Sequence, residues 1–171
     1  MMTRDELRAL QAPVKTRFQE HPEAALATLR ATGRLEGAGI TVTLDTFSGV
    51  TPAGLHPACG GDGLSACSAE MLLQALAGCA GVTLKAVATA MEIPLRGGSV
   101  TVEGDLDFRG TMGVSKQAPV GFTAIRLLFD LDADANADQL ANLTRLVERY
   151  CVVHQTLSHP PTLTTIIRTH L

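Results

Sequence analysis

The sequence is poor in aromatic residues and in concentrated positive charge. It has no Trp, one Tyr and five Phe among 171 residues. Stacking on nucleic-acid bases depends on aromatic side chains, so this mode of binding is not expected. Fourteen Lys and Arg face seventeen Asp and Glu, and no basic run is present that could follow a phosphate backbone. We therefore expect no nucleic-acid partner.

The sequence also lacks recognisable membrane-directing segments. Two Arg, one Asp and one Glu within residues 4–8 interrupt any apolar core of a signal peptide. The most apolar stretch, residues 68–91, is free of charge over only fourteen positions, whereas a bilayer span needs about 20 residues. We expect a cytoplasmic protein without a membrane partner, in which cysteines stay reduced.

Aliphatic residues are abundant by contrast. Hydrophobic residues make up 46% of the chain and charged residues 18%, which is enough to bury a core and unlike a disordered chain. The length fits one domain. We expect one folded unit with an aliphatic core.

Hydrophobic periodicity, capping residues and glycines predict the order of the elements. The predicted elements are a helix that begins after Thr3 and ends or bends at Pro13, strands over 24–34 and 39–45 with Gly37 and Gly39 in the turn, a loop over 48–65, a helix over 68–91, strands around 100–108 and 125–131, a helix over 135–150 and a last strand over 163–171. Strands and helices in this order are typical of an α+β fold.

The helix over 68–91 is the most unusual element. Its only charges are Glu70 and Lys85, and apolar or small residues occupy every side of the helical wheel. A helix that is hydrophobic all round is a buried helix. A domain of this size rarely surrounds such a helix alone, so the pattern predicts a second subunit and hence a homodimer.

Two of the four cysteines lie on predicted helices. Cys79 is in the middle of the apolar helix, next to Gly78, where its surroundings would be apolar. Cys151 ends the later helix, close in sequence to Arg149 and His154, which could lower a thiol pKa. Both cysteines could instead be small packing residues, because free cysteine is often buried.

The other two cysteines, Cys59 and Cys67, flank a glycine-rich loop. With His56 they offer a metal site as an alternative, but their spacing is not a regular zinc pattern. The loop lacks the Lys and Ser/Thr of a phosphate-binding loop, and no serine has a GxSxG context. We expect neither a cofactor nor a metal.

Two segments resemble motifs of a known family. Residues 68–79, SAEMLLQALAGC, resemble the central-helix motif of the OsmC/Ohr family of osmotically inducible and organic hydroperoxide resistance proteins. Residues 148–153, ERYCVV, resemble its second cysteine motif. The resemblance covers roughly residues 24–171, so residues 1–23 would be an N-terminal helical extension to an OsmC-like domain.

The resemblance implies a fold and a reaction. The fold would be an OsmC-like α+β fold with antiparallel sheets around a long buried central helix, in an intertwined homodimer. The reaction would be reduction of alkyl or lipid hydroperoxides in oxidative-stress defence. Cys79 would form a sulfenic acid, Cys151 would resolve it as a disulfide, and a dithiol partner would reduce the disulfide.

The chain departs from the family's peroxidases at two points. They carry a glutamate ten residues before the reactive cysteine, where this chain has Ala69, and Glu70 stands nine residues before it. On an ideal helix that offset moves the carboxylate from about 80° to about 180° away from the cysteine. A glutamate nine residues before resembles the YhfA-like branch of the family, and Glu70 is the candidate catalytic carboxylate.

The second departure is the absence of a cation. The loop from Thr46 to Cys67 has no Arg or Lys, although the peroxidases use an arginine to hold the thiolate. Arg30, Arg34 and His56 are the candidates to replace it. The alternative function is a non-peroxidatic OsmC-like protein that binds a small apolar or thiol ligand at the dimer interface.

Overall fold

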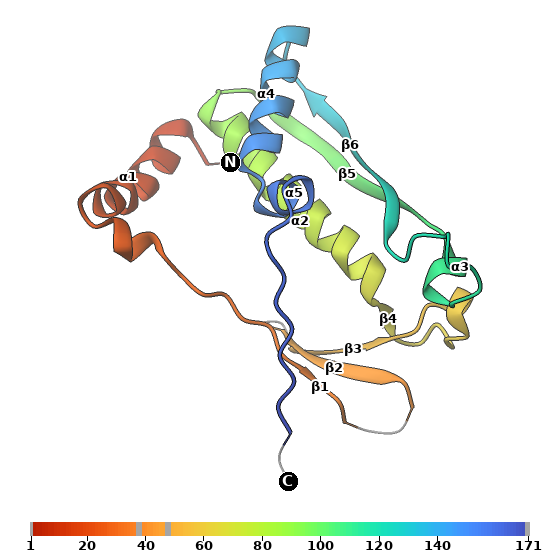
Figure 1. The fold of residues 1–171 in the computed structure, drawn as a ribbon. Coiled ribbons are helices and arrows are strands. Elements are labelled where there is room, and N and C mark those ends of the chain that lie inside the picture. Colours follow the sequence, from red (N-terminus) through yellow and green to blue (C-terminus); the bar gives the residue numbers. More distant parts are fainter. Residues whose placement is uncertain (1, 37–38, 47–48, 170–171) are drawn as a thin grey trace.

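The computed structural model describes residues 2–36, 39–46 and 49–169 (Figure 1). Its elements in chain order are α1 (Arg4–Glu20), β1 (Gly33–Arg34), β2 (Thr41–Thr46), β3 (Gly49–Gly54), β4 (Ala66–Cys67), α2 (Ser68–Ala90), β5 (Leu95–Leu106), α3 (Phe108–Thr111), β6 (Phe122–Ala133), α4 (Ala137–Tyr150) and α5 (Val152–Ser158). Strands β1 to β4 form one sheet in sequence order, antiparallel except for the short β3–β4 pair. Strands β5 and β6 form an antiparallel hairpin. The α+β class is confirmed.

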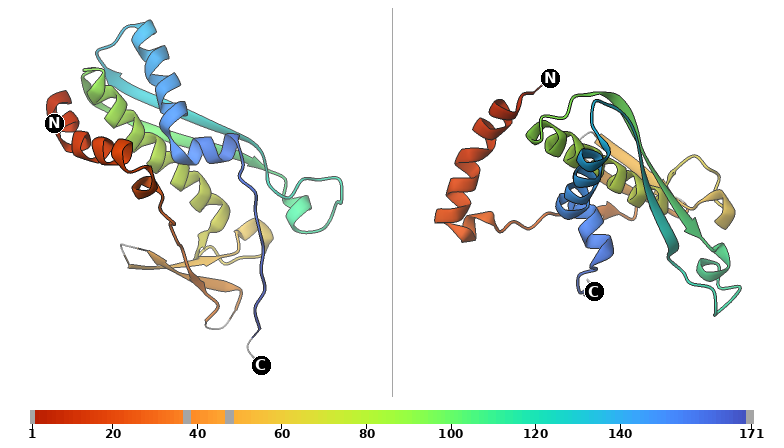
Figure 2. Two further views of the ribbon diagram at one scale, coloured as in Figure 1. Left: turned by 60° about the vertical axis from the view of Figure 1, so that its left-hand side comes forward. Right: turned by 90° about the horizontal axis from the view of Figure 1, so that it is seen from above.

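Helix α2 runs through the centre of the molecule. It contacts β5 on one side and α4 and α5 on another, as both views of Figure 2 show. Its buried residues are four positions apart and therefore lie along one face: Leu76, Ala80, Leu84 and Ala88. They pack in one core cluster with Leu143, Val147 and Cys151.

The predicted helix over 68–91 is confirmed, but its burial within one chain is incomplete. The side of α2 that faces away from the core cluster carries Val82, 72% exposed, and Leu72, one turn before Leu76, is 39% exposed. Ser68–Ala90 also has the length and composition of a membrane span. Its contacts with β5, α4 and α5 identify it as the central helix of this fold.

Local sequence explains the helix ends. Asn136 and Gln139 form a capping box at the start of α4, and Thr3 and Glu6 form another at the start of α1. The prediction that α1 ends or bends at Pro13 is wrong about its end, because the helix continues to Glu20. The carbonyl group of exposed Ala9 loses its helical donor at this proline but remains open to solvent.

Three predicted segments differ from the structure. Only Gly33–Arg34 of the predicted strand over 24–34 is a strand, because Pro22–Ala25 forms a 3₁₀ turn and residues 26–32 have no strand to pair with. Residues 163–169 of the predicted last strand are likewise unpaired, and 170–171 lie outside the described residues. The predicted loop over 48–65 contains β3, which pairs along its length with β2. The turn residue Gly37 also lies outside the described residues.

The chain exposes more surface than a monomer of its mass normally does. Its accessible area is 12854 Å², whereas a folded monomer of 18.0 kDa exposes about 8,000 Å². Helix α1, which has no buried residue, and the C-terminal segment stand away from the centre of the molecule (Figures 1 and 2). One chain therefore leaves much apolar surface uncovered.

The core between α2 and α4 gives the first testable prediction. Leu143→Ala removes a side chain that is 1% exposed and leaves a cavity beside Leu76, so unfolding should become easier by about 2–5 kcal/mol. Urea denaturation at one fixed protein concentration measures this change. Leu140→Ala on the same helix, where Leu140 is 38% exposed, is the matched control. Equal losses in the two variants would contradict this description of the core.

Candidate active site

Cys79 lies halfway along α2, at the edge of the core cluster. Its side chain is half-buried, and its neighbours at one-turn spacing on the same side of the helix are Leu72, Ala75 and Val82. Gly78 leaves space beside it, since nothing lies within 4 Å of the position that a Cβ atom would take there. The thiol is therefore placed between the protein core and an apolar outer face.

Cys151 lies at the junction of α4 and α5. Helix α4 ends at Tyr150, Cys151 is extended (φ −73°, ψ 110°), and α5 begins at Val152. The first amides of a helix have no partner within it. Here the amides of Val152 and Val153 lie near the sulfur of Cys79 and lower its pKa. The one-residue junction thus holds the two cysteines together.

Burial and nearby donor groups shift the ionisation of Cys79 in opposite directions. Burial raises the pKa of the thiol, but the amide of Val153, the thiol of Cys151, the amide of Val152 and the hydroxyl of Thr83 all favour the thiolate. Together they outweigh burial, and the pKa of Cys79 is lowered. The Thr83 hydroxyl has the smallest effect of the four, and its single hydrogen is donated to the Cys79 carbonyl oxygen at 2.8 Å.

Cys151 is shifted in the opposite direction. Its side chain is fully buried, and this burial raises its pKa. The amides of His154 and Val153 oppose the shift, whereas the hydrogen bond to Cys79 and the negative charge there add to it. The proton therefore stays on Cys151 while Cys79 ionises.

Such a pair is suited to thiol redox chemistry. The thiolate is the nucleophilic form of cysteine, and a neighbouring thiol can convert an oxidised sulfur to a disulfide. All four cysteines are free thiols in this structure. Among the described residues, no three His, Cys, Asp or Glu side chains come together as a potential metal site. The alternative set of His56, Cys59 and Cys67 therefore does not form one.

The predicted cations lie elsewhere in the chain. Arg34 on β1 forms ion pairs with Asp45 and Glu36. Arg30 is exposed in the extended segment before β1, and its side chain has no described partner in the parts of the chain that the structure covers. The hydrogen bonds that set the Cys79 pKa involve no positively charged group. The roles of Arg30 and Arg34 stay predictions.

Glu70 and His56 meet at a separate cavity near the start of α2. This cavity of about 420 Å³ is also lined by Cys67 and Phe108. The His56 ring stacks on Phe108 with centroids 4.9 Å apart, and its Nδ1 accepts a hydrogen bond from the Ala58 amide. Glu70 is nine residues, or about 13 Å along the axis, from Cys79. The structure thus places Glu70 and His56 at the same cavity, away from Cys79 and Cys151.

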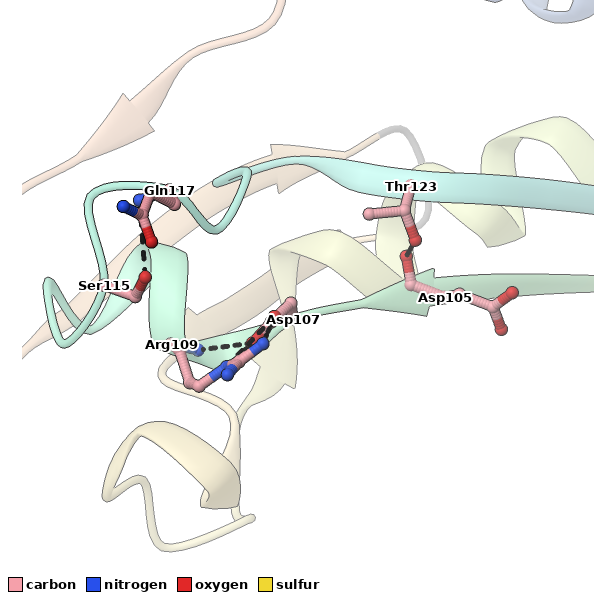
Figure 3. A network of polar contacts seen from close by, with 6 residues as sticks. All are labelled: Asp105, Asp107, Arg109, Ser115, Gln117 and Thr123. Atoms are coloured by element: carbon pink, nitrogen blue, oxygen red, sulfur yellow. Dashed lines mark hydrogen bonds and ion pairs between the residues drawn. The ribbon is translucent and has the colours of Figure 1, made fainter.

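Polar contacts close the end of the β5–β6 hairpin beside this cavity. Figure 3 shows the Arg109 guanidinium on the carboxylate of Asp107, and the Thr123 hydroxyl donating to the Asp105 carbonyl oxygen. The hydrogen bonds from Arg109 lower the pKa of Asp107. The positive charge of Arg109 is therefore paired with the carboxylate of Asp107.

Sequence reasoning missed the backbone donors near Cys79. Thr83 lies on the same side of the helix as Cys79, as helical spacing predicts. The amides of Val152 and Val153 act through the backbone, and only the start of a new helix directly after Cys151 would have indicated them.

The opposite pKa shifts predict different reactivities for the two thiols. In a C59S/C67S background, alkylation of Cys79 by iodoacetamide should have a pH midpoint below that of an ordinary thiol, and Cys151 should react later. Cys151→Ala removes a donor to the thiolate, so it should raise the midpoint of Cys79. Cys151→Ser keeps a hydroxyl donor and is the matched control. A midpoint that is the same in all three proteins would rule out this account of the pKa.

Comparison with known proteins places this geometry in a family. Solved structures with the same fold include an OsmC-like protein from Mycoplasma pneumoniae, with 17% identity, a TM-score of 0.65 and coverage of 78% of this chain and 89% of that one. An organic hydroperoxide resistance protein OsmC from Legionella pneumophila has 19% identity, a TM-score of 0.59 and coverage of 79% and 92%. The organic hydroperoxide resistance protein OhrB of Bacillus subtilis has 16% identity, a TM-score of 0.57 and coverage of 80% and 94%.

The sequence itself gives a narrower result. No curated protein sequence matches the chain. The family model described as OsmC-like protein matches residues 61–166, which include both Cys79 and Cys151 and more than half of the chain. The YhfA-like branch stays a prediction. The protein belongs to the OsmC-like family.

Proposed function

We propose that this protein reduces organic hydroperoxides through a disulfide cycle of Cys79 and Cys151. The observation that carries the proposal is that Cys79 packs against the buried core cluster that contains Cys151. The pKa of Cys79 is lowered and that of Cys151 is raised, which agrees with it. Membership of the OsmC-like family, with fold neighbours named for organic hydroperoxide resistance, supports a role in peroxide defence.

The cycle has three chemical steps. The Cys79 thiolate attacks one peroxide oxygen, the O–O bond breaks, and the organic group leaves as an alcohol after it takes up a proton. The resulting sulfenic acid is attacked by Cys151, which forms the disulfide and releases water. A dithiol reductant then restores both thiols by exchange. This cycle uses no cofactor or metal.

The surroundings of Cys79 favour an organic substrate. Leu72, Ala75 and Val82 extend an apolar surface to either side of the thiol. An alkyl or lipid group gains free energy when it leaves water for such a surface, whereas hydrogen peroxide has no such group. The alternative, ligand binding without redox chemistry, is less favoured, because Cys79 packs against the core cluster that contains Cys151 and the Cys151 thiol lowers the pKa of Cys79.

A second copy of the chain completes the proposal. The apolar row of α2 beside Cys79 and the large exposed area of the single chain both call for a covering partner. Interfaces of obligate dimers bury roughly 2,000–5,000 Å², a size that the excess surface accommodates. Arg30, on the exposed segment before β1, is the cation that we propose the second copy brings toward Cys79.

The disulfide cycle makes a direct prediction. Cumene hydroperoxide should convert the reduced wild-type protein to a form with a Cys79–Cys151 disulfide, which peptide mass spectrometry detects. Cys79→Ser should abolish peroxide consumption, and Cys151→Ser should stop after one turnover with a trappable sulfenic acid. Cys59→Ser and Cys67→Ser are the controls and should behave as wild type. Retention of all thiols in the treated wild-type protein would refute the proposal.

The dimer makes a separate prediction. Wild type should sediment as a dimer, and Val82→Glu should shift it toward monomer because a carboxylate would be buried there without a partner. Val114→Glu alters a residue of similar exposure, 75%, after α3 and should leave the dimer intact. Sedimentation velocity measures both. A monomeric wild type, or equal dissociation in the two variants, would contradict the proposed interface.

A further inference from the structure

Helix α1 has an apolar stripe that stays largely open to solvent. Its four members follow helical spacing and fall within an arc of about 80° on an ideal helix: Leu7, Leu10, Val14 and Phe18. Leu10 is 61% exposed, Val14 is 46% exposed and Phe18 is 36% exposed. The helix lies before the residues that match the family model, so membership of the family assigns it no role.

Basic side chains border the stripe. On the same ideal helix Arg8 and Lys15 lie on one flank, and Arg17 lies on the other. The Arg17 guanidinium is 5.3 Å from the centroid of the Phe18 ring. An apolar centre with a polar rim is the usual anatomy of a protein interface, in which aromatic residues and Arg are enriched.

The rest of the same chain does not cover the stripe. The main contacts of α1 are with α2 and with the 3₁₀ turn Pro22–Ala25. An ion pair of 2.7 Å between Arg4 Nη1 and Glu92 Oε2 links its start to the end of α2. Residues 26–32, which join it to β1, form no strand, and Leu29 there is 92% exposed. The helix is thus an arm whose stripe is available to another molecule.

The arm stands beside the surface that a second copy is proposed to cover. It lies on the side of α2 opposite to the β5–β6 hairpin (Figures 1 and 2). Glu92, to which the arm is linked, follows Val82 by ten residues, or about 15 Å along an ideal helix axis. An interface with about 20–30 residues on each side is wide enough to include both surfaces.

Charge favours a second copy over a lipid surface as the partner. Helix α1 carries four Lys or Arg and three Asp or Glu, whereas the whole chain has a net charge of −3. The remainder of a second copy is therefore acidic and attracts the arm. An anionic membrane would attract the arm but repel the rest of the chain.

We propose that α1 is an interaction arm whose apolar stripe packs against a second copy of this chain, on the side of α2 that carries Val82. The two-fold symmetry of a homodimer means that each copy gives one arm and receives one. This inference rests on the dimer of the proposed function. It adds to that dimer a segment outside the residues shared with the family.

The direct test is a photochemical crosslink in the full-length protein. Benzoylphenylalanine in place of Leu10 should give a band of dimer size on a denaturing gel after irradiation, and peptide mass spectrometry should find the link on α2. The same group in place of Thr16, which is exposed on the opposite face of α1, is the control and should give no such band. A link from position 10 that stays within one chain, or equal dimer bands from both positions, would overturn the inference.

The affinity of the dimer measures how much the stripe contributes. Leu10→Glu together with Val14→Glu should raise the dissociation constant at least about a hundredfold, because burial of each apolar side chain accounts for more than tenfold. Ala9→Glu together with Thr16→Glu adds the same charge on the opposite face and should keep the wild-type constant. Sedimentation equilibrium measures both, and circular dichroism checks that the helix persists.

Two results of this measurement would speak against the arm. Equal dissociation constants in the two double variants would show that the stripe takes no part in the dimer. Binding of wild type to phosphatidylglycerol vesicles, lost in the stripe variant while its dissociation constant stays that of wild type, would assign the stripe to a membrane instead.

Reaction with peroxide separates this inference from the peroxidase proposal. If the dimer needs the stripe but wild type does not react with cumene hydroperoxide, the peroxidase proposal fails and the role of α1 is supported. If wild type reduces the hydroperoxide and Val82→Glu dissociates the dimer, but the stripe variant keeps the wild-type affinity, the inference fails and the peroxidase proposal stands.

Discussion

The chemistry proposed for this protein depends on the placement of the Cys79 sulfur near the first amides of α5. These amides are free because a helix start has no internal acceptors for them. They reach Cys79 because α4 and α5 are separated by the single extended residue Cys151. The packing of Leu76 against Leu143 and Val147 holds α4 on α2 and so keeps this junction in place.

This arrangement assigns different tasks to two identical functional groups. Donors at Cys79 stabilise a negative charge in a half-buried position, and burial keeps the proton on Cys151. Backbone amides and neutral groups thus stabilise the Cys79 thiolate within one chain, which is part of the role expected of a cation. The apolar row of α2 beside Cys79 stays uncovered in a single chain.

Much of the fold could be predicted from the sequence, because periodicity determined α4 and the β5–β6 hairpin and a long run of apolar and small residues determined α2. Of the strand predicted over 24–34 only Gly33–Arg34 formed, and residues 163–169 formed none, since a strand needs a partner that alternation alone does not reveal. Cys79 and Cys151 could be chosen from their motifs. The donors Val152 and Val153 could not, because their amides carry no side-chain signature.

The most direct test of the account is the rate at which Cys79 is oxidised by an organic hydroperoxide relative to hydrogen peroxide. In the C59S/C67S protein, competition between cumene hydroperoxide and hydrogen peroxide should favour the organic substrate by at least about tenfold, since burying two CH₂ groups provides roughly 1.6 kcal/mol. Rate constants for both oxidants that are equal to those of free cysteine would contradict the account, because neither the lowered pKa nor the apolar surface would then affect the reaction.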